Sequence, residues 1–234
     1  MTSSSPDIRL RGAVQRMHEP LGGVLCLDFA NTLEPRGGPP PVAVPPEVDL
    51  RDELETYDDL VGWAVHKQVI DEGTGLSLLD LADRDPAATA AVLAQAWVLR
   101  DVIYRAFWAI AQGESPATTD LKALMETYVE AAAHAELVDA GGQVVWEWPT
   151  HGASLASPCW PVALSAIDLL QHGDRSRIRV CPGPGRPPLA CAWLFYDTTR
   201  NGSRRWCSMA DCGSATKIRR QTARRRATRQ GLRD

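Results

Sequence analysis

Apolar residues recur at intervals of three and four along most of the chain, which is the spacing of helices that bury one face. Asp85 followed by Pro86 is a strong helix start, because aspartate caps the first turn and proline tolerates the first helical position. The pattern predicts helices over residues 50–69, 76–81, 86–111, 119–136 and 161–171.

Short stretches of alternating apolar residues predict a few strands among these helices. Residues 24–28 alternate and predict a strand that turns into a helix at Asp28. Residues 143–148 alternate after a Gly-Gly turn and predict another strand, whereas residues 1–17 are expected to be mobile. The sequence therefore predicts an α+β protein, with a mostly helical N-terminal domain and a small sheet over 1–174.

Composition divides the chain into an acidic body and a basic tail. The chain has 234 residues, is 44% hydrophobic and has a net charge of −4, which suits one globular domain with a small appendage. Residues 200–234 hold 11 basic and 2 acidic side chains, whereas residues 1–199 hold 14 basic and 27 acidic ones. Such an asymmetry predicts a polyanion, above all a nucleic acid, as the partner of the tail.

The chain has no run of 18 apolar residues, and no apolar leader follows Met1. We therefore expect no membrane span, no secretion signal and a cytoplasmic protein.

Thiols in such a chain bind metals more often than they form disulfides. The spacing C-x9-C-x15-C-x4-C predicts one structural Zn²⁺ held by four thiolates, Cys181, Cys191, Cys207 and Cys212. His172 is an alternative to the first of these, and Cys26 and Cys159 are expected to be core thiols.

The residues around the last cysteines predict a small treble-clef-like module over 178–234, a β-hairpin followed by a helix. Asn201-Gly202 is a strong signal for a type I′ turn, so residues 192–197 and 204–207 are expected to pair. Ser214 is a candidate cap for the basic helix that follows.

Basic side chains of this module are the candidates for phosphate contacts. They are Arg204, Arg205, Lys217, Arg219, Arg220, Arg224, Arg225 and Arg226. Two other interpretations remain open, a solvated tail and a tail that folds back on the acidic body.

Several motifs resemble those of CGNR-type zinc-finger proteins of bacteria and of the ABATE domain that accompanies this finger. In the finger they are Trp193-Leu194-Phe195, Asp197, Arg200-Asn201-Gly202, Arg204-Arg205-Trp206-Cys207-Ser208-Met209 and Cys212-Gly213. In the N-terminal part they are residues 27–32, 57–64, 99–105 and 160–163. The resemblance implies that the protein is a stress-induced transcription regulator. The family motif Cys-Gly-Asn-Arg is Cys212-Gly213-Ser214-Ala215 here, so a contact made by the missing arginine would be lost.

Polar residues of the N-terminal part are candidates for a small-ligand pocket: Asp28, Asn31, Arg36, Arg100 and Tyr104. A buried Arg100 would need a carboxylate, which Asp28 or a ligand anion would supply. The simpler interpretation is that these residues cap helices and form surface ion pairs.

The sequence leaves two functions open. One is a DNA-binding transcription regulator with a ligand-sensing N-terminal domain. The alternative is an enzyme with its pocket in that domain and the finger as a structural brace. The chain carries no recognisable catalytic motif.

Overall fold

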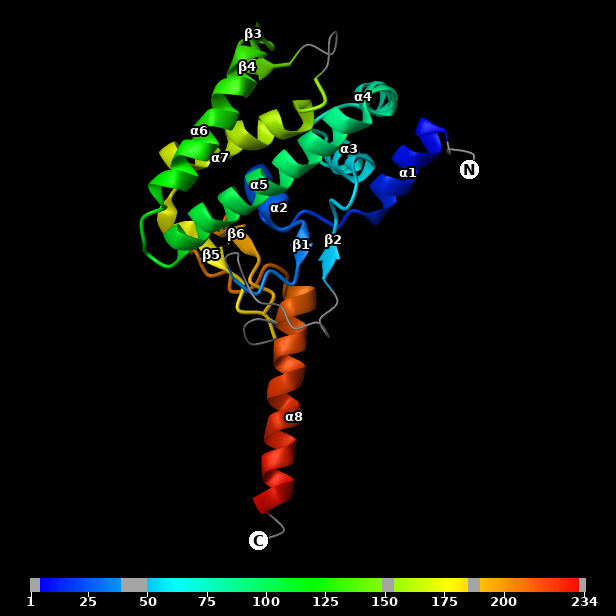
Figure 1. Cartoon of the computed structure of the whole chain (residues 1–234). Coiled ribbons are helices and arrows are strands. Elements are labelled where there is room, and N and C mark those ends of the chain that lie inside the picture. Colours follow the sequence, from blue (N-terminus) through cyan, green and yellow to red (C-terminus); the bar gives the residue numbers. More distant parts are fainter. Residues whose placement is uncertain (1–4, 39–49, 149–153, 185–189, 232–234) are drawn as a thin grey trace.

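The structure, a computed structural model, describes residues 5–38, 50–148, 154–184 and 190–231, except for the side chains of residues 226–227 and 229–231. A helical body carries a small C-terminal module, and one long helix extends away from both (Figure 1). The helices are α1 (Pro6–Arg16), α2 (Leu25–Ala30), α3 (Tyr57–His66), α4 (Glu72–Arg84), α5 (Pro86–Ala111), α6 (Thr118–Ala133), α7 (Trp160–His172) and α8 (Ser214–Gly231).

Three two-stranded antiparallel sheets accompany the helices in the described residues. They pair β1 (Leu33–Glu34) with β2 (Arg51–Asp52), β3 (Glu136–Asp139) with β4 (Val144–Glu147), and β5 (Ile178–Val180) with β6 (Leu194–Tyr196). The arrangement confirms the predicted α+β class, with helices dominant in the N-terminal part. Among the described residues, no helix is both long enough and apolar enough to cross a membrane.

Local capping explains where the helices begin. The side chain of Asp85 accepts a hydrogen bond of 3.0 Å from the Ala88 amide, so α5 starts and ends as the sequence predicts. α3 begins later than predicted, at residue 57, because Thr56 and Asp59 form a capping box in front of it. α4 is longer than predicted because Asp71 caps it at the Thr74 amide.

Two predictions for the N-terminal residues were wrong. Residues 6–16 form the helix α1, which buries Leu10 and Ala13 against the body; residues 1–4 of the stretch predicted to be mobile lie outside the described part. Residues 25–30 form the helix α2 and not a strand. Cys26, Leu27, Phe29 and Ala30 of α2 are all buried, and a short run that is apolar on several sides gives no clear helical period.

The hydrophobic core continues from the helical body into the C-terminal module. Ile178 of β5 and Leu194 of β6 belong to the same buried cluster as Leu27, Ile103 and Phe107. β5 contacts α5 and β6 contacts α2, so the small sheet packs directly on the helices. A second, smaller cluster surrounds the cysteines with Trp193 and Phe195.

Candidate metal centre and nucleic-acid interface

The four cysteines predicted as ligands meet in one place. The Sγ atoms of Cys181, Cys191, Cys207 and Cys212 all lie within 4.8 Å of one another. The Sγ atoms of Cys191 and Cys207 are 3.6 Å apart, and those of Cys207 and Cys212 are 3.7 Å apart. A tetrahedron with Zn–S bonds of about 2.3 Å requires sulfurs about 3.8 Å apart, whereas a disulfide would bring them to about 2 Å.

The donor set therefore fits one zinc ion and not a disulfide pair. Four protein ligands leave no coordination position open for water or substrate, so the ion would stabilise the fold and would not catalyse a reaction. Cys26 and Cys159 lie away from this cluster, inside the main core. Burial raises the pKa of each of these two thiols to about 12, as expected for core thiols that stay protonated.

The sheet β5–β6 places the first two ligands. Cys181 directly follows β5, and its amide donates to the carbonyl of Trp193 at 2.8 Å. The amide of Ala192 donates back to the carbonyl of Cys181 at 3.2 Å, which extends the pairing to Ala192, the residue after Cys191. Ala192 has a φ of 54°, a left-handed conformation that turns the chain at the metal ligand.

The predicted hairpin through Asn201-Gly202 was wrong, because β6 pairs with β5 and residues 204–207 form no strand. Gly202 has a positive φ of 56°, but Asn201 does not, so the turn is not of type I′. The buried carboxylate of Asp197 organises this loop instead. It accepts hydrogen bonds from the amide of Thr199 (2.9 Å), the hydroxyl of Thr199 (2.6 Å) and the amide of Arg204 (2.9 Å).

A π-helical turn brings the last two ligands together. The side chain of Ser208 accepts a hydrogen bond of 3.1 Å from the Asp211 amide and caps a π-helical turn over Met209–Gly213. This turn runs directly into α8, so the cap is Ser208 and not the predicted Ser214. The hydroxyl of Thr216 then donates to the carbonyl of Cys212 at 2.7 Å, which joins the fourth ligand to the start of α8.

Residues of the helical body hold the loop that carries Cys191. The side-chain amide of the buried Asn31 donates to the carbonyl of Leu194 at 2.8 Å and accepts from the Leu194 amide at 2.9 Å. Asn31 thus bonds to β6 as a neighbouring strand would. The hydroxyl of Tyr104 donates to the carbonyl of Ala192 at 2.6 Å, and the amide of Arg36 donates to the carbonyl of Cys191 at 3.1 Å.

The five candidate pocket residues therefore take part in contacts within the protein. Arg100 is buried and forms a bidentate ion pair with Asp52 at 2.6 and 2.9 Å. The carboxylate that pairs with Arg100 is therefore that of Asp52, and not that of Asp28 or of a ligand. Arg36 stacks on the Tyr104 ring at 3.9 Å and pairs with Asp101. Asp28 accepts from the Gly22 amide at 2.7 Å and lies 4.0 Å from Lys67. These contacts join α2, α5 and the finger, and none of the five residues lines either of the two cavities described below.

A basic groove of about 520 Å³ lies beside the zinc site, between β5, the segment 204–206 and α8. Arg179, Arg205 and Arg220 line it, together with Trp206 and Thr216. The indole nitrogen of Trp206 is buried and has no hydrogen-bond partner among the described residues. The sequence did not single out Arg179, because one arginine in a short strand forms no motif. Trp206 lies in one of the motifs named above but was not predicted to be a site residue.

Arg204 differs from the other predicted phosphate ligands. Its guanidinium donates to the carbonyls of Leu21 (2.6 Å), Trp206 (3.0 Å) and Cys207, and it stacks on the Phe195 ring at 4.6 Å. These bonds occupy the side chain, so Arg204 connects the N-terminal segment to the zinc ligand Cys207.

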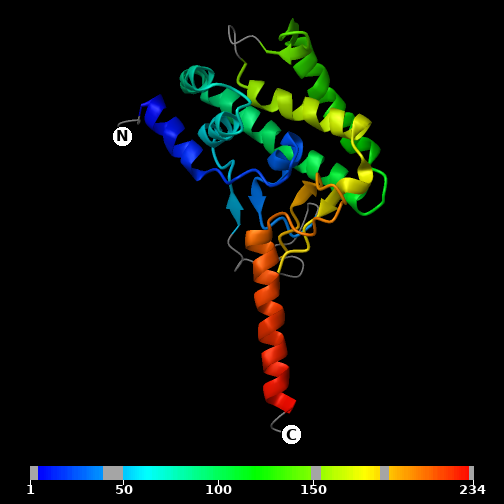
Figure 2. The same ribbon diagram turned by 180° about the vertical axis from the view of Figure 1, so that it is seen from behind.

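Helix α8 carries the remaining basic residues and stands apart from the body in both views (Figures 1 and 2). The segment 214–231 contains seven basic residues and no acidic one. Its described basic side chains are all exposed: Lys217, Arg219, Arg220, Arg224 and Arg225. Arg226 lies on the same helix, with its side chain outside the described part. In the structure α8 does not fold back on the acidic body.

The four-cysteine cluster, the small sheet that positions it and the helix that leaves it define a zinc-finger protein. Comparison with protein families agrees: residues 177–225 match the family described as "CGNR zinc finger". Residues 23–173 match ABATE, described as "Putative stress-induced transcription regulator", and the chain belongs to this family. Comparison with curated proteins finds no match.

Proposed function

We propose that this protein is a transcription regulator that binds duplex DNA through its zinc finger and α8, mainly by contacts with phosphates. The observation that carries the proposal is α8 itself, a helix with basic side chains and no acids, whose residues 217–225 are all exposed. An α-helix of this kind fits the major groove, where its cations neutralise the phosphates on both sides.

The basic groove beside the metal supports the same proposal. Arg179, Arg205 and Arg220 converge from a strand, a loop and α8, and the Trp206 indole adds a buried donor. Phosphate oxygens accept hydrogen bonds from such groups, so a backbone phosphate at the base of α8 would fix the angle at which α8 meets the duplex. The zinc ion would hold the groove in shape, because Cys181, Cys207 and Cys212 directly adjoin its three walls.

Sequence specificity is a separate matter. The two positions that differ from the family motif are the exposed Ser214 and the half-buried Ala215, at the first turn of α8. Neither side chain carries a charge or an amide, so base readout from the start of α8 would be weak. We propose that affinity comes from the phosphates, and that DNA sequence has a smaller effect.

A test compares charge variants in a fluorescence anisotropy titration with a labelled 20-base-pair duplex at 50 mM salt. The triple variant Lys217→Gln/Arg220→Gln/Arg224→Gln should bind at least about 100-fold more weakly, if each phosphate contact contributes on the order of 1 kcal/mol. The matched control is Arg84→Gln, an exposed arginine at the end of α4. Equal affinities of the triple variant and the control would refute the proposed interface.

A further inference from the structure

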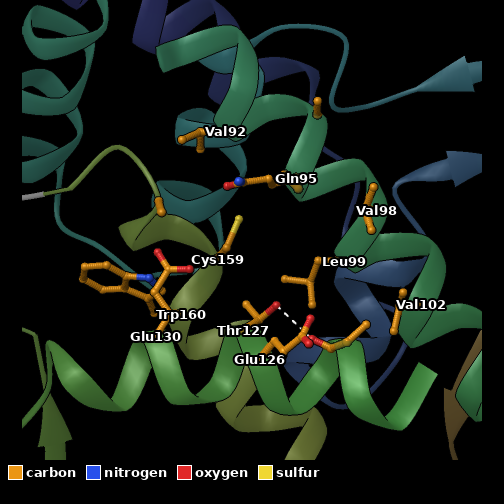
Figure 3. Close-up of a pocket in the computed structure, with 14 residues that line it drawn as sticks. Val92, Gln95, Val98, Leu99, Val102, Glu126, Thr127, Glu130, Cys159 and Trp160 are labelled. Atoms are coloured by element: carbon orange, nitrogen blue, oxygen red, sulfur yellow. Dashed lines mark hydrogen bonds between the residues drawn. The ribbon is translucent and has the colours of Figure 1, made fainter. Parts of the chain in front are cut away.

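A second cavity lies in the helical body, away from the zinc site and from the five residues predicted to form a pocket. It has a volume of about 380 Å³ and lies between α5, α6 and the start of α7 (Figure 3). Its walls are mostly apolar, with Val92, Val98, Leu99 and Val102 of α5 facing Ala123 of α6. This size and lining are typical of sites for small organic molecules.

One polar group inside the cavity lacks a partner. Trp160 is only 4% exposed, and its indole nitrogen is buried with no hydrogen-bond acceptor among the described residues. Stacking against His134, with ring centroids 4.7 Å apart, fixes the orientation of the indole. Figure 3 shows the indole nitrogen on the edge of the ring that faces the cavity. A buried N–H without an acceptor is costly, so this edge favours a ligand that accepts a hydrogen bond there.

The charges around the cavity have one sign. Glu126 and Glu130 lie one turn apart on α6 and both line the cavity, whereas the described lining includes no Lys, Arg or His. The carboxylate of Glu126 has an exposed lysine, Lys122, at 3.8 Å, and no ion pair is formed by Glu130 among the described residues. Thr127, between the two acids, donates its hydroxyl to the Ala123 carbonyl and adds no charge (Figure 3).

The thiol of Cys159 on the same wall is neutral. Burial, and then the nearby Glu130 carboxylate, raise the pKa of Cys159 to about 12. The cavity therefore combines an apolar interior, one free donor and a negative rim that repels anions.

We propose that this cavity binds a small organic cation that also carries a hydrogen-bond acceptor, with its apolar part against α5, its ammonium group beside Glu130 and Glu126, and its acceptor at the Trp160 indole N–H. The inference goes beyond the proposed DNA binding and gives the ligand-sensing role expected from the sequence a place and a ligand class. It replaces the polar pocket predicted from the sequence, whose residues are engaged in other contacts. A carboxylate or phosphate ligand would meet two like charges and no cationic partner there.

The experiment is isothermal titration calorimetry on the zinc-loaded full chain at pH 7 without DNA. Two probes share one ring system, whose neutral ring nitrogen accepts a hydrogen bond, and differ in charge: quinolin-6-ylmethylammonium and quinoline-6-carboxylate. We expect the ammonium to bind at least about tenfold more tightly, since the rim charges attract one probe and repel the other. Equal binding of both probes, or binding of neither, would overturn the proposal.

Variants locate the binding. Ala123→Leu fills the cavity from α6 and should abolish binding of the ammonium. Glu130→Gln should weaken binding by about fivefold, the effect of one exposed ion pair. Glu114→Gln, an exposed acid between α5 and α6 that does not line the cavity, is the matched control and should bind as the unaltered chain does.

Thermal melting should confirm that the cavity variants are folded, and Glu126→Gln provides a second charge variant if Glu130→Gln is not. Unchanged binding in Ala123→Leu would place the probe elsewhere and overturn the proposal. So would light scattering that shows a dimer closing this face and excluding the probe. Because the measurement involves no DNA, its failure would leave the DNA-binding proposal untouched.

Discussion

Asn31 is the clearest test of whether the helical body holds the zinc finger in place. Its side chain makes two hydrogen bonds with the backbone of Leu194, at 2.8 and 2.9 Å, and both residues are buried. Asn31→Ala removes both bonds and leaves an amide and a carbonyl of β6 without partners. Each unsatisfied buried group costs about 1–3 kcal/mol, so the substitution should destabilise the protein by about 2–5 kcal/mol.

For a chain of this size the loss corresponds to a fall in melting temperature on the order of 10 °C. Circular dichroism would follow the melt, and a chromogenic chelator would report the rate at which zinc leaves. Both should change, because Leu194 is joined through Trp193 and Ala192 to the ligand Cys191. Asn201→Ala, at an exposed position of the same module, is the control. An Asn31→Ala protein that melts and retains zinc as the control does would refute this coupling.

Three further predictions concern the metal and the loop beside it. Purified protein should contain one zinc per chain, and Cys207→Ser should lower both the zinc content and the melting temperature, as elemental analysis and calorimetry would show; normal zinc in that variant would exclude Cys207 as a ligand. Removal of zinc with a chelator should abolish DNA binding while most of the helical circular dichroism remains, and DNA binding by the metal-free chain would contradict the proposed role of the ion. Burial would raise the pKa of Asp197, but the bonds from Thr199 and Arg204 outweigh it and hold the pKa below the ordinary value. The stabilisation from Asp197 is therefore complete above about pH 4 and is lost as the pH falls further, and Asp197→Asn should flatten the acid side of the stability curve measured by urea unfolding.

The sequence predicted those parts of the fold that local chemistry determines. α5 was predicted with its bounds, because Asp85 and Pro86 mark its start and its apolar stripe is long. The four ligands were predicted because thiols at this spacing have few other roles in a chain of this kind.

Long-range contacts explain what the sequence did not predict. The partner of β6 is β5, fixed by the bonds between Cys181 and Trp193 and by Asn31, which lies 163 residues from Leu194 in the chain. A local turn signal such as Asn201-Gly202 carries no information about either contact. The cavity between α5, α6 and α7 and the position of Arg179 likewise depend on packing between distant segments, and no sequence motif predicts them.

The salt dependence of DNA binding tests the central claim most directly. If the five exposed basic residues described on α8 contact phosphates, the plot of log affinity against log salt concentration should have a slope of about −4 to −5. Affinity for a 20-base-pair duplex would then fall by about 500-fold between 50 and 200 mM salt, and by less for the triple α8 variant. A slope near zero, or no binding at 50 mM salt, would contradict the claim that this finger and its helix bind DNA through the phosphate backbone.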